Sequence, residues 1–354
     1  MSTQKELAKY AGVSAGTVSN VISGSTQVSE RSRQKVLEAI RVLNYRPNLI
    51  ARSLKTNRTS TLGIVVPDIT IPFFPKIIRG AESAARERGY FLMVLDSEGN
   101  HDREIDMIAL LHAQRVEGLL LVAAGGKKWS ADNFARITSG TPVVCVDRLP
   151  DGLHVDSVCV DDRNAAEKGV SHLLAIGHKQ IAIVTGPLSL ENERERLQGY
   201  REAMRSAGLS VQDSLIWIGG FDRRDVARAC QPGLLKRKDR PTALFATNGV
   251  TGLEAVRFIY ESGLSIPKDI SFVSLDDFMI EDFFQPSITS VVQPAFDMGY
   301  CAVKVLLDRI AKGKDHSPYE QIRLPAALVV RDSSQAISRA ERKSQRSVSS
   351  ESLA

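Results

Sequence analysis

The segment QKELAKYAGVSAGTVSNVIS, residues 4–23, contains two short helical patterns joined by a Gly-Val-Ser turn. Thr3 and Glu6 have the spacing of a capping box, which predicts that a first helix begins here. Gly12 ends that helix, and Ser14 is the expected N-cap of a second helix. Two short helices joined by a tight turn are typical of a helix-turn-helix DNA reader.

The two helices have separate apolar and outward faces. The apolar residues at helical spacing are Leu7, Ala8, Ala11, Val18, Val21 and Ile22. The outward residues of the second helix are small or polar, and they are Ala15, Gly16, Thr17, Ser19 and Asn20. Such a helix can lie deep in a major groove and present hydroxyl and amide groups to base edges. We therefore predict that this face contacts DNA, together with Thr3 and Ser14.

A third helix is predicted to begin at Ser29 and to close a small domain. Its apolar residues are Val36, Leu37, Ile40 and Leu43, and its end is marked by Asn44 and Pro47. The three helices define a predicted DNA-binding domain at residues 1–46. From pattern alone, the first two helices also fit the core of a larger α/β domain.

The distribution of charge favours the DNA-binding interpretation. The first 58 residues contain ten Lys or Arg and three Glu, a net charge of +7. The whole chain carries +5, so the other residues sum to −2. Positive charge at one end of a chain indicates contact with a polyanion, because neutralised phosphates supply the sequence-independent part of DNA affinity.

Residues 47–60 form a predicted hinge and linker. The run NLIARSL at 48–54 can form two helical turns, which are marginal alone, and polar sequence follows it. Together with the helix-turn-helix segment, NYRPN at 44–48 and ARSL at 51–54 resemble the DNA-binding domain and hinge of the lactose/galactose repressor (LacI/GalR) family.

The resemblance implies a hinge helix that folds only when two protomers pair over DNA. Leu54 would then enter the minor groove as an apolar wedge and kink the duplex. The hinge residues that would contact DNA are Asn48, Ala51, Arg52, Leu54 and Lys55. In the alternative, Leu54 only packs against the next domain.

Beyond the linker, short apolar runs alternate with helical stretches, which is typical of βαβ units and parallel sheets. The predicted fold class is therefore α/β, with the helix-turn-helix domain and hinge helix preceding the core. Strands are predicted at 62–66, 90–95, 118–122, 142–146, 180–184, 215–218, 243–245 and 270–274. Helices are predicted near 74–88, 101–114, 162–176, 194–207, 222–235, 249–262 and 295–312.

The core at residues 61–331 is too long for a single hydrophobic core, so two lobes are expected. The family resemblance implies a periplasmic-binding-protein-like core whose chain crosses between the lobes near 161, 290 and 318. The N-lobe would comprise about 61–160 and 291–317, and the C-lobe about 161–290 and 318–331.

Motifs for catalysis are missing from the sequence. No G-x-G-x-x-G follows the first predicted strand, and the chain has no Walker A, G-x-S-x-G or H-E-x-x-H motif, so we expect no enzyme and no cofactor. The four cysteines and six histidines lack metal-ligand spacing, so we expect no metal site. Polar sequence after Met1 and the lack of a long apolar run lead us to expect a cytoplasmic protein.

A ligand site is expected in the cleft at the carboxyl ends of the strands. The predicted effector-binding residues are Ile71, Phe73, Phe74, Asp147, Arg148, Arg196, Phe221, Asn248 and Asp276. The Arg-x-x-Gly-Tyr spacing that begins at Arg196 resembles the family's effector-binding arginine. An aromatic face with carboxylates and an arginine suits a sugar, because ring carbons stack on Phe while Asp and Arg hydrogen-bond to adjacent hydroxyls.

These residues also have structural alternatives. Arg196 would serve equally as a cap or a salt-bridge partner, and Asp147 as the cap of a following helix. The chain has Asn248-Gly249 where many family members have Asn-Asp, so one expected carboxylate is absent. A sugar effector remains the expectation, and no residue favours a purine.

These features predict a homodimeric transcription regulator, a repressor, whose operator affinity changes when a small molecule closes the core. The alternatives are a carbohydrate-binding or enzyme domain with a vestigial DNA module, and a regulator driven by a protein partner. Dimerisation is expected along N-lobe helices such as 74–88. Residues 332–354 contain no apolar heptad and are predicted to form a disordered tail.

Replacing Leu54 with Ala should weaken binding to a pseudo-palindromic operator far more than binding to random DNA, because only the specific complex uses the apolar wedge. Replacing Arg52 or Lys55 should instead weaken both and flatten the salt dependence, as expected for phosphate contacts. Fluorescence anisotropy titrations at several salt concentrations measure both effects. Equal losses on operator and random DNA would contradict the wedge role of Leu54.

Overall fold

The structure is a computed structural model of the 354-residue chain. It describes residues 3–22, 26–45, 58–125, 129–138, 140–150, 152–221, 223–230, 235, 237, 240–277, 285–313 and 318–337. The chain divides into two compact units, Met1–Thr59 and Ser60–Ala354, which are described separately.

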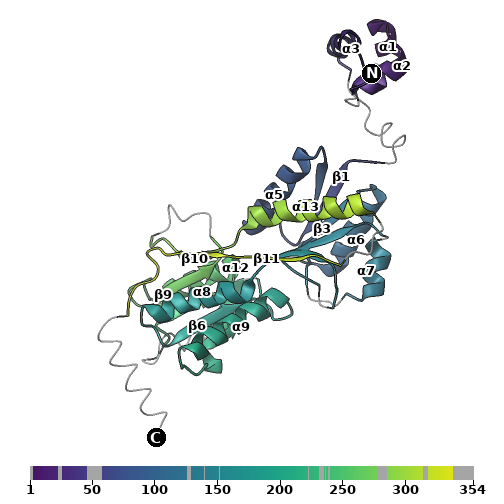
Figure 1. Cartoon of the computed structure of the whole chain (residues 1–354). Coiled ribbons are helices and arrows are strands. Elements are labelled where there is room, and N and C mark those ends of the chain that lie inside the picture. The colour runs from purple at the N-terminus through teal and green to yellow at the C-terminus, as the bar shows by residue number, and fades with distance from the viewer. Residues whose placement is uncertain are drawn as a thin grey trace. The chain divides into compact units, whose positions relative to one another are not determined.

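The first unit contains three helices, α1 (Gln4–Ala11), α2 (Ala15–Ile22) and α3 (Glu30–Val42) (Figure 1). The predicted capping box is present, since the Thr3 backbone N–H donates to Glu6 Oε2 at 2.8 Å and the Glu6 N–H donates to Thr3 Oγ1 at 3.3 Å. Gly12 has a φ of 62°, the left-handed conformation that ends α1. Ser14 Oγ accepts from the Thr17 N–H at 3.1 Å and so caps α2.

The core of this unit is formed by one side chain or more from each helix. Leu7, Val18 and Val36 are fully buried. The predicted apolar face of α3 is wrong at Leu37, which is 46 % exposed. Ala39 is buried instead, because residues three apart share a helix face whereas Leu37 lies about 100° around the axis from Val36.

The second unit is built from two six-stranded sheets, each forming the centre of one lobe (Figure 1). The N-lobe sheet has the order β11-β5-β4-β3-β1-β2, and all of its neighbouring strands are parallel. Its strands are β1 (Thr61–Val66), β2 (Phe91–Asp96), β3 (Gly118–Leu121), β4 (Val143–Val146), β5 (Asp156–Val160) and β11 (Gln321–Leu324). Its helices are α5 (Phe73–Glu87), α6 (His101–Ala113), α7 (Ala131–Thr138) and α13 (Ala295–Lys312).

The C-lobe sheet has the order β12-β10-β9-β8-β6-β7 and is parallel except between β12 and β10. Its strands are β6 (Ile181–Thr185), β7 (Ile216–Ile218), β8 (Ala243–Ala246), β9 (Ser271–Leu275), β10 (Thr289–Val292) and β12 (Ala327–Val329). Its helices are α8 (Asp162–Ala175), α9 (Glu191–Ser206), α10 (Arg223–Ala229) and α12 (Gly249–Glu261), with a short 3₁₀ turn at Asp213–Leu215.

Every strand predicted in the core is present, and each of its ends lies within one residue of the predicted position. Helix α10 is shorter than the predicted 222–235, and the sequence pattern missed β5, β10, β11, β12 and α7. Among the described residues, no helix combines the length and the apolar character that a membrane crossing requires.

The chain passes between the lobes at residue 161, at 293–294 and at 325–326. The predicted third crossing near 318 is wrong, because β11 pairs with β5 in the N-lobe, with Ile322 beside Val158. The predicted boundary at 290–291 is wrong as well, since β10 completes its pairing with β9 at Val291 and lies wholly in the C-lobe.

The start of the predicted disordered tail at 332 is also wrong. Ser333 Oγ donates to the Phe272 carbonyl at 2.7 Å, and the Ser333 N–H donates to the Ser287 carbonyl at 2.9 Å. Ile337 is 5 % exposed, and its N–H donates to the Ile176 carbonyl at 3.2 Å. This segment is ordered because its backbone continues the hydrogen bonding at the edge of the C-lobe; residues 338–354 lie outside the described residues.

Glycines allow two pairs of helices to cross with their backbones in contact. A Cβ added at Gly80 of α5 would lie 2.0 Å from the Phe296 carbonyl oxygen of α13, and one at Gly299 of α13 would lie 2.0 Å from the Ile77 oxygen of α5. In the C-lobe, a Cβ at Gly199 of α9 would lie 2.1 Å from the Arg163 oxygen of α8. Each lobe therefore has a helix pair whose spacing depends on the absence of a side chain.

Replacing Gly299 with Ala should destabilise the protein, although Ala gains about 1 kcal/mol in helix propensity. The new methyl group would force α5 and α13 apart, and such overpacking costs about 1–3 kcal/mol or more. Gly249→Ala is the matched control, because its Cβ would meet only Asp276 Cβ at 3.6 Å. Urea denaturation followed by circular dichroism should show a lower midpoint for Gly299→Ala alone, and an unchanged midpoint would contradict the tight crossing.

Candidate functional site

The first unit presents the outward face of α2 as predicted from the sequence. Ala15, Gly16 and Asn20 are exposed, and Thr17 and Ser19 are half-buried. Thr3 and Ser14 are exposed at the starts of α1 and α2. Ser14 and Thr17 lie side by side, with 2.9 Å between their hydroxyl oxygens. The predicted hinge contacts Asn48, Ala51, Arg52, Leu54 and Lys55 lie outside the described residues.

The second unit brings all the predicted effector residues to one pocket between its lobes, which we call the interlobe pocket. Its lining contains Ile71, Phe73, Phe74, Asp147, Arg148, Arg196, Phe221, Asn248 and Asp276. Five further residues line the pocket and were not among the predicted contacts, namely Asn192, Glu193, Gly249, Val250 and Gln293. Asn192 and Glu193 lie about one helical turn before Arg196, so this spacing could have identified them.

Two aspartates enter the pocket from equivalent places in the two lobes. Asp147 follows β4 and Asp276 follows β9, and both have a left-handed backbone, with φ values of 65° and 79°. The Asp147 N–H donates to the Val158 carbonyl of β5, and the Asp276 N–H donates to the Val291 carbonyl of β10, both at 3.0 Å. A left-handed non-glycine residue costs about 1–2 kcal/mol and is enriched at functional sites. The same strained turn therefore aims a carboxyl group into the pocket from each side.

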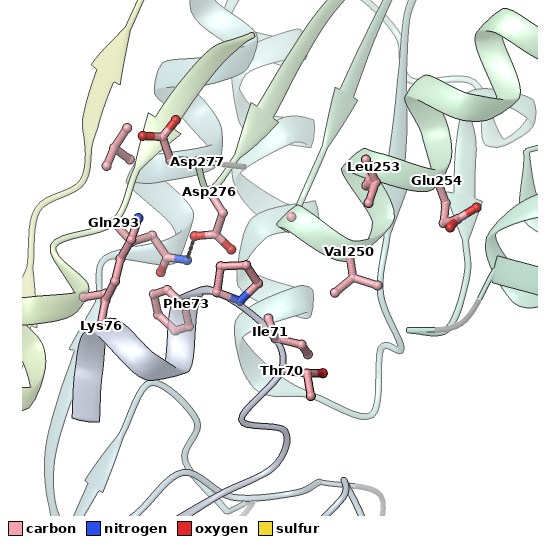
Figure 2. A pocket seen from close by; sticks show the side chains of 14 residues that line it. Thr70, Ile71, Phe73, Lys76, Val250, Leu253, Glu254, Asp276, Asp277 and Gln293 are labelled. Carbon is pink, nitrogen blue, oxygen red and sulfur yellow. Dashed lines mark hydrogen bonds between the residues drawn. The ribbon is translucent and has the colours of Figure 1, made fainter. Parts of the chain in front are cut away.

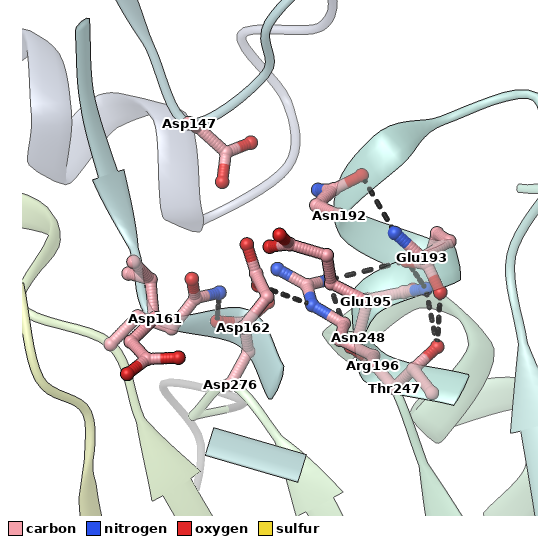
Figure 3. A network of polar contacts seen from close by, with 12 residues as sticks. Asp147, Asp161, Asp162, Asn192, Glu193, Glu195, Arg196, Thr247, Asn248 and Asp276 are labelled. Atoms are coloured by element: carbon pink, nitrogen blue, oxygen red, sulfur yellow. Dashed lines mark hydrogen bonds and ion pairs between the residues drawn. The ribbon is translucent and has the colours of Figure 1, made fainter. Parts of the chain in front are cut away.

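Arg196 is the centre of a buried polar network (Figure 3). Its Nε lies 2.7 Å from Asp162 Oδ1, and its Nη1 donates to the Thr247 carbonyl at 2.9 Å and to Glu193 Oε1 at 3.2 Å. Burial opposes the charge of Arg196, but the surrounding carboxylates outweigh it and raise the arginine pKa. Arg196 therefore has the salt-bridging role that was the structural alternative, while one side of it still lines the pocket.

Glu193 connects this network to the end of β8. Its Oε2 accepts from the Gly186 N–H at 3.0 Å and from Thr247 Oγ1 at 2.5 Å, and its Oε1 accepts from Asn248 Nδ2 at 2.9 Å. Asn248 Oδ1 in turn accepts from the Thr251 N–H at 2.9 Å and so caps α12. Glu193 and Asn248 are thus held rigidly beside the pocket.

Two aromatic rings, one from each lobe, flank the Arg148 guanidinium. Its central carbon lies 5.5 Å from the Phe74 ring centre and 5.2 Å from the Phe221 ring centre. These distances are within the range of cation–π attraction. Arg148, which belongs to the N-lobe, therefore contacts an aromatic ring of each lobe.

Three buried polar atoms of the interlobe pocket have no hydrogen-bond partner among the residues that the structure describes. They are Asp147 Oδ1, Arg148 Nε and Gln293 Oε1. Gln293 uses its other amide atom, since Nε2 donates to Asp276 Oδ1 at 2.5 Å. Arg148 Nε lies 3.6 Å from Asp147 Oδ2, which is too long for a hydrogen bond.

Burial changes the acidity of the pocket aspartates. It raises the pKa of Asp147 to about 6, an effect that Arg148 and Arg196 only partly oppose. Burial also raises the pKa of Asp276, against the influence of Arg196 and Gln293. Among the described residues, no group of three or more His, Cys, Asp or Glu side chains is arranged to hold a metal ion.

Each of the two units matches a known protein family. Residues 59–331 match the family described as periplasmic binding proteins and sugar binding domain of LacI family. Residues 3–48 match the bacterial regulatory proteins of the lacI family.

Named relatives and solved structures cover nearly the whole chain. The chain is 34 % identical to the transcriptional repressor PurR of Aliivibrio salmonicida, over 89 % of this chain and 94 % of the relative. It is 36 % identical to the ribose operon repressor of Escherichia coli K12, over 88 % of this chain and 94 % of the relative.

Two solved structures share the architecture. The Lac repressor dimer bound to operator and the anti-inducer ONPF superposes with a TM-score of 0.81 and 27 % identity, over 95 % of this chain and 99 % of that one. A complex of the transcriptional regulator CelR with cellobiose gives a TM-score of 0.69 and 32 % identity, over 94 % of this chain and 100 % of that one.

The helix-turn-helix unit, the two parallel-sheet lobes and the matched families lead to one conclusion. This chain is a member of the LacI family of DNA-binding transcriptional regulators.

Proposed function

We propose that the interlobe pocket binds a small sugar and that this binding controls the affinity of the protein for its operator. The unpartnered atoms of Asp147, Arg148 and Gln293 carry the proposal. A buried polar atom left without a partner costs about 1–3 kcal/mol, so native proteins rarely keep several in one place. Adjacent sugar hydroxyls can donate to the two oxygens and accept from the guanidinium, which satisfies all three.

The rings of Phe74 and Phe221 would position the sugar by packing against its ring. A ring that enters between Phe74 and Phe221 has to take the place of the Arg148 guanidinium, which would leave its two cation–π contacts and turn towards a hydroxyl that satisfies its Nε. Arg196 and Asn248 are held by the buried network and need no rearrangement to meet the ligand. Such preorganised groups lose little entropy on binding.

The ligand would act by favouring one angle between the lobes. Phe74, Asp147 and Arg148 belong to the N-lobe, whereas Phe221 and Asp276 belong to the C-lobe, so one ligand contacts both. A ligand shifts a conformational equilibrium only through different contacts in the two states, and contacts from opposite lobes provide them. The lobe angle would set the spacing of the two hinge segments in a homodimer, and hence the cost of folding them on operator DNA.

The proposed protein is a repressor that acts as a homodimer on a pseudo-palindromic site in the cytoplasm. The relatives are named as repressors, and the Lac repressor structure is a dimer bound to operator. A two-fold protein matches a two-fold site, with one recognition helix in each half. The core would act by binding alone, without catalysis, and the names of the relatives as repressors support this.

A purine base is a second candidate effector. The rings of Phe74 and Phe221, whose centres lie 5.5 and 5.2 Å from the Arg148 guanidinium carbon, suit a flat base as well as a sugar ring. Isothermal titration of the full chain with D-ribose, D-glucose, D-galactose, hypoxanthine and guanine separates the two. Binding of a purine without binding of any sugar would overturn the sugar proposal.

Phe221→Ala and Asp276→Asn should each weaken effector binding about tenfold or more while operator affinity without effector stays within about twofold. Asn is chosen at position 276 because it tolerates the left-handed backbone. Arg196 is unsuitable for this test, because its removal would leave Asp162 and Glu193 as buried carboxylates without their partner.

The measurement is operator release against effector concentration, with the exposed Asp213→Asn as the control. A wild-type response in either pocket variant would show that the residue is not an effector contact.

The affinity for a neutral sugar should fall as the pH is lowered through about 6, the raised pKa of Asp147. If the sugar donates to the Asp147 carboxylate, binding favours the ionised form, so protonation competes with it by up to tenfold per pH unit. Arg148, Arg196, Asp276 and Glu193 are the charged neighbours that also influence this group. Asp147→Asn should remove most of this pH dependence in calorimetric titrations between pH 5 and 8, and an unchanged slope would contradict the contact.

A further inference from the structure

An ion pair joins the two lobes beside two of the crossings between them. Arg323 belongs to β11 of the N-lobe, and its Nη1 donates to Oε2 of Glu195, on α9 of the C-lobe, at 2.6 Å. At the crossings, the Asp161 N–H donates to the carbonyl of Leu324, the residue after Arg323, at 3.0 Å. Any rotation of one lobe against the other moves α9 relative to β11, so it changes the length of this ion pair.

The ion pair closes a narrow crevice between the lobes, whose volume of about 10 Å³ is at most enough for about one water molecule. Its lining includes four carboxylates, which are Asp147, Asp162, Glu191 and Glu195. Figure 3 shows Asp147 of the N-lobe across the crevice from Asp162 and Glu195 of the C-lobe. Arg196 already compensates Asp162, and Arg323 is the one cation among the described lining residues. Like charges this close repel each other, so Arg323 offsets a repulsion that would separate the lobes.

Helix α9 contacts the N-lobe at a second place. Leu190, directly before the helix, is 6 % exposed, and a Cβ added at Gly125 of the N-lobe would lie 2.3 Å from Leu190 Cδ2. The same helix carries Arg196, which lines the interlobe pocket. A displacement of α9 would therefore alter the contacts between the lobes and the wall of the pocket together.

We propose that the Arg323–Glu195 ion pair is a latch that favours the closed crevice when no effector is bound. When the latch is broken, the lobes open more often, and the operator affinity of the effector-free protein changes. The effect on operator affinity rests on the proposed function, in which the lobe angle controls DNA binding. The effect on lobe opening does not rest on it.

Hydroxyl-radical footprinting of the full chain with mass spectrometry measures lobe opening. Phe73 of the N-lobe and Val250 of the C-lobe line one pocket from opposite sides, and neither lines the crevice (Figure 2). Arg323→Gln should raise the oxidation rates of both side chains by up to about fivefold, since a partly exposed ion pair changes an equilibrium by about that factor at most. Faster oxidation confined to α9 and β11 would show that the pair only stabilises its surroundings, and would overturn the latch.

Two further variants test the charges. Glu195→Gln alone should have a smaller effect than Arg323→Gln, because Arg323 would still face other carboxylates. In the Arg323→Gln background, Glu195→Gln should lower the oxidation rates, because it removes one of the repelling charges. If it raises them further instead, the two residues act independently and the latch is wrong.

Arg163→Gln is the matched control. Arg163 of α8 forms an ion pair with Glu202 of α9, so this pair is of the same type but lies within the C-lobe. The control should keep the wild-type oxidation rates of Phe73 and Val250. An increase as large as that of Arg323→Gln would overturn the latch.

Fluorescence anisotropy with an operator selected from random DNA tests the link to gene control. Without effector, Arg323→Gln should change operator affinity by about two- to fivefold. Its difference from the wild type should shrink as salt rises from about 0.05 M to about 0.5 M, because salt screens partly exposed charges. If the lobes open more often but operator affinity is unchanged, the latch stands and the proposed control by lobe angle fails. If operator affinity changes while both oxidation rates stay at the wild-type level, the latch is wrong.

Discussion

A buried arginine holds three segments of the C-lobe together. Arg196 is 2 % exposed, and a charge so far from water is tolerated only when hydrogen-bond partners surround it. Its partners come from the start of α8, from its own helix α9 and from the chain after β8. These elements must keep their positions together, because the loss of one contact would leave a buried charge uncompensated. Arg148 provides the contrast, since its side chain is 10 % exposed and its Nε lacks a partner among the described residues. One arginine holds the wall of the pocket, and the other remains available to a ligand.

Much of the fold could be predicted from the sequence, because buried parallel strands are continuous apolar runs between amphipathic helices. The strands that the pattern missed are different in character. β11 and β12 are edge strands with half-exposed or exposed side chains, and β5 contains Asp156 and Ser157. Asp156 is buried because Arg309, far along the chain, reaches its carboxylate at 2.7 Å. No local window contains that partner, so the strand could not be identified from its own residues.

The site residues that directly follow a strand could be predicted from the sequence. Residues after β1 and β4 gather at one edge of the N-lobe sheet, and residues after β8 and β9 at one edge of the C-lobe sheet, because parallel strands bring their carboxyl ends together. The role of Arg196 was harder to assign, since the same Arg-x-x-Gly-Tyr spacing fits a ligand contact and an ion pair. Gln293 was missed because β10 was missed. The third crossing between the lobes was placed too early, because β11 is recognisable only from its pairing with β5.

The position of Arg148 has a consequence for the sensitivity of the regulator. The slot between Phe74 and Phe221 already holds a side chain of the protein itself, so every external molecule meets an intramolecular competitor. Because the Arg148 side chain is covalently attached, its local concentration beside the two rings does not change with the concentration of metabolites in the cell. The free energy of its two cation–π contacts is subtracted from the affinity of any ligand, which raises the threshold concentration for a response. Substitutions at residue 148 would thus change the threshold of gene control in two opposing ways, because they remove both the competitor for the slot and a donor to the ligand.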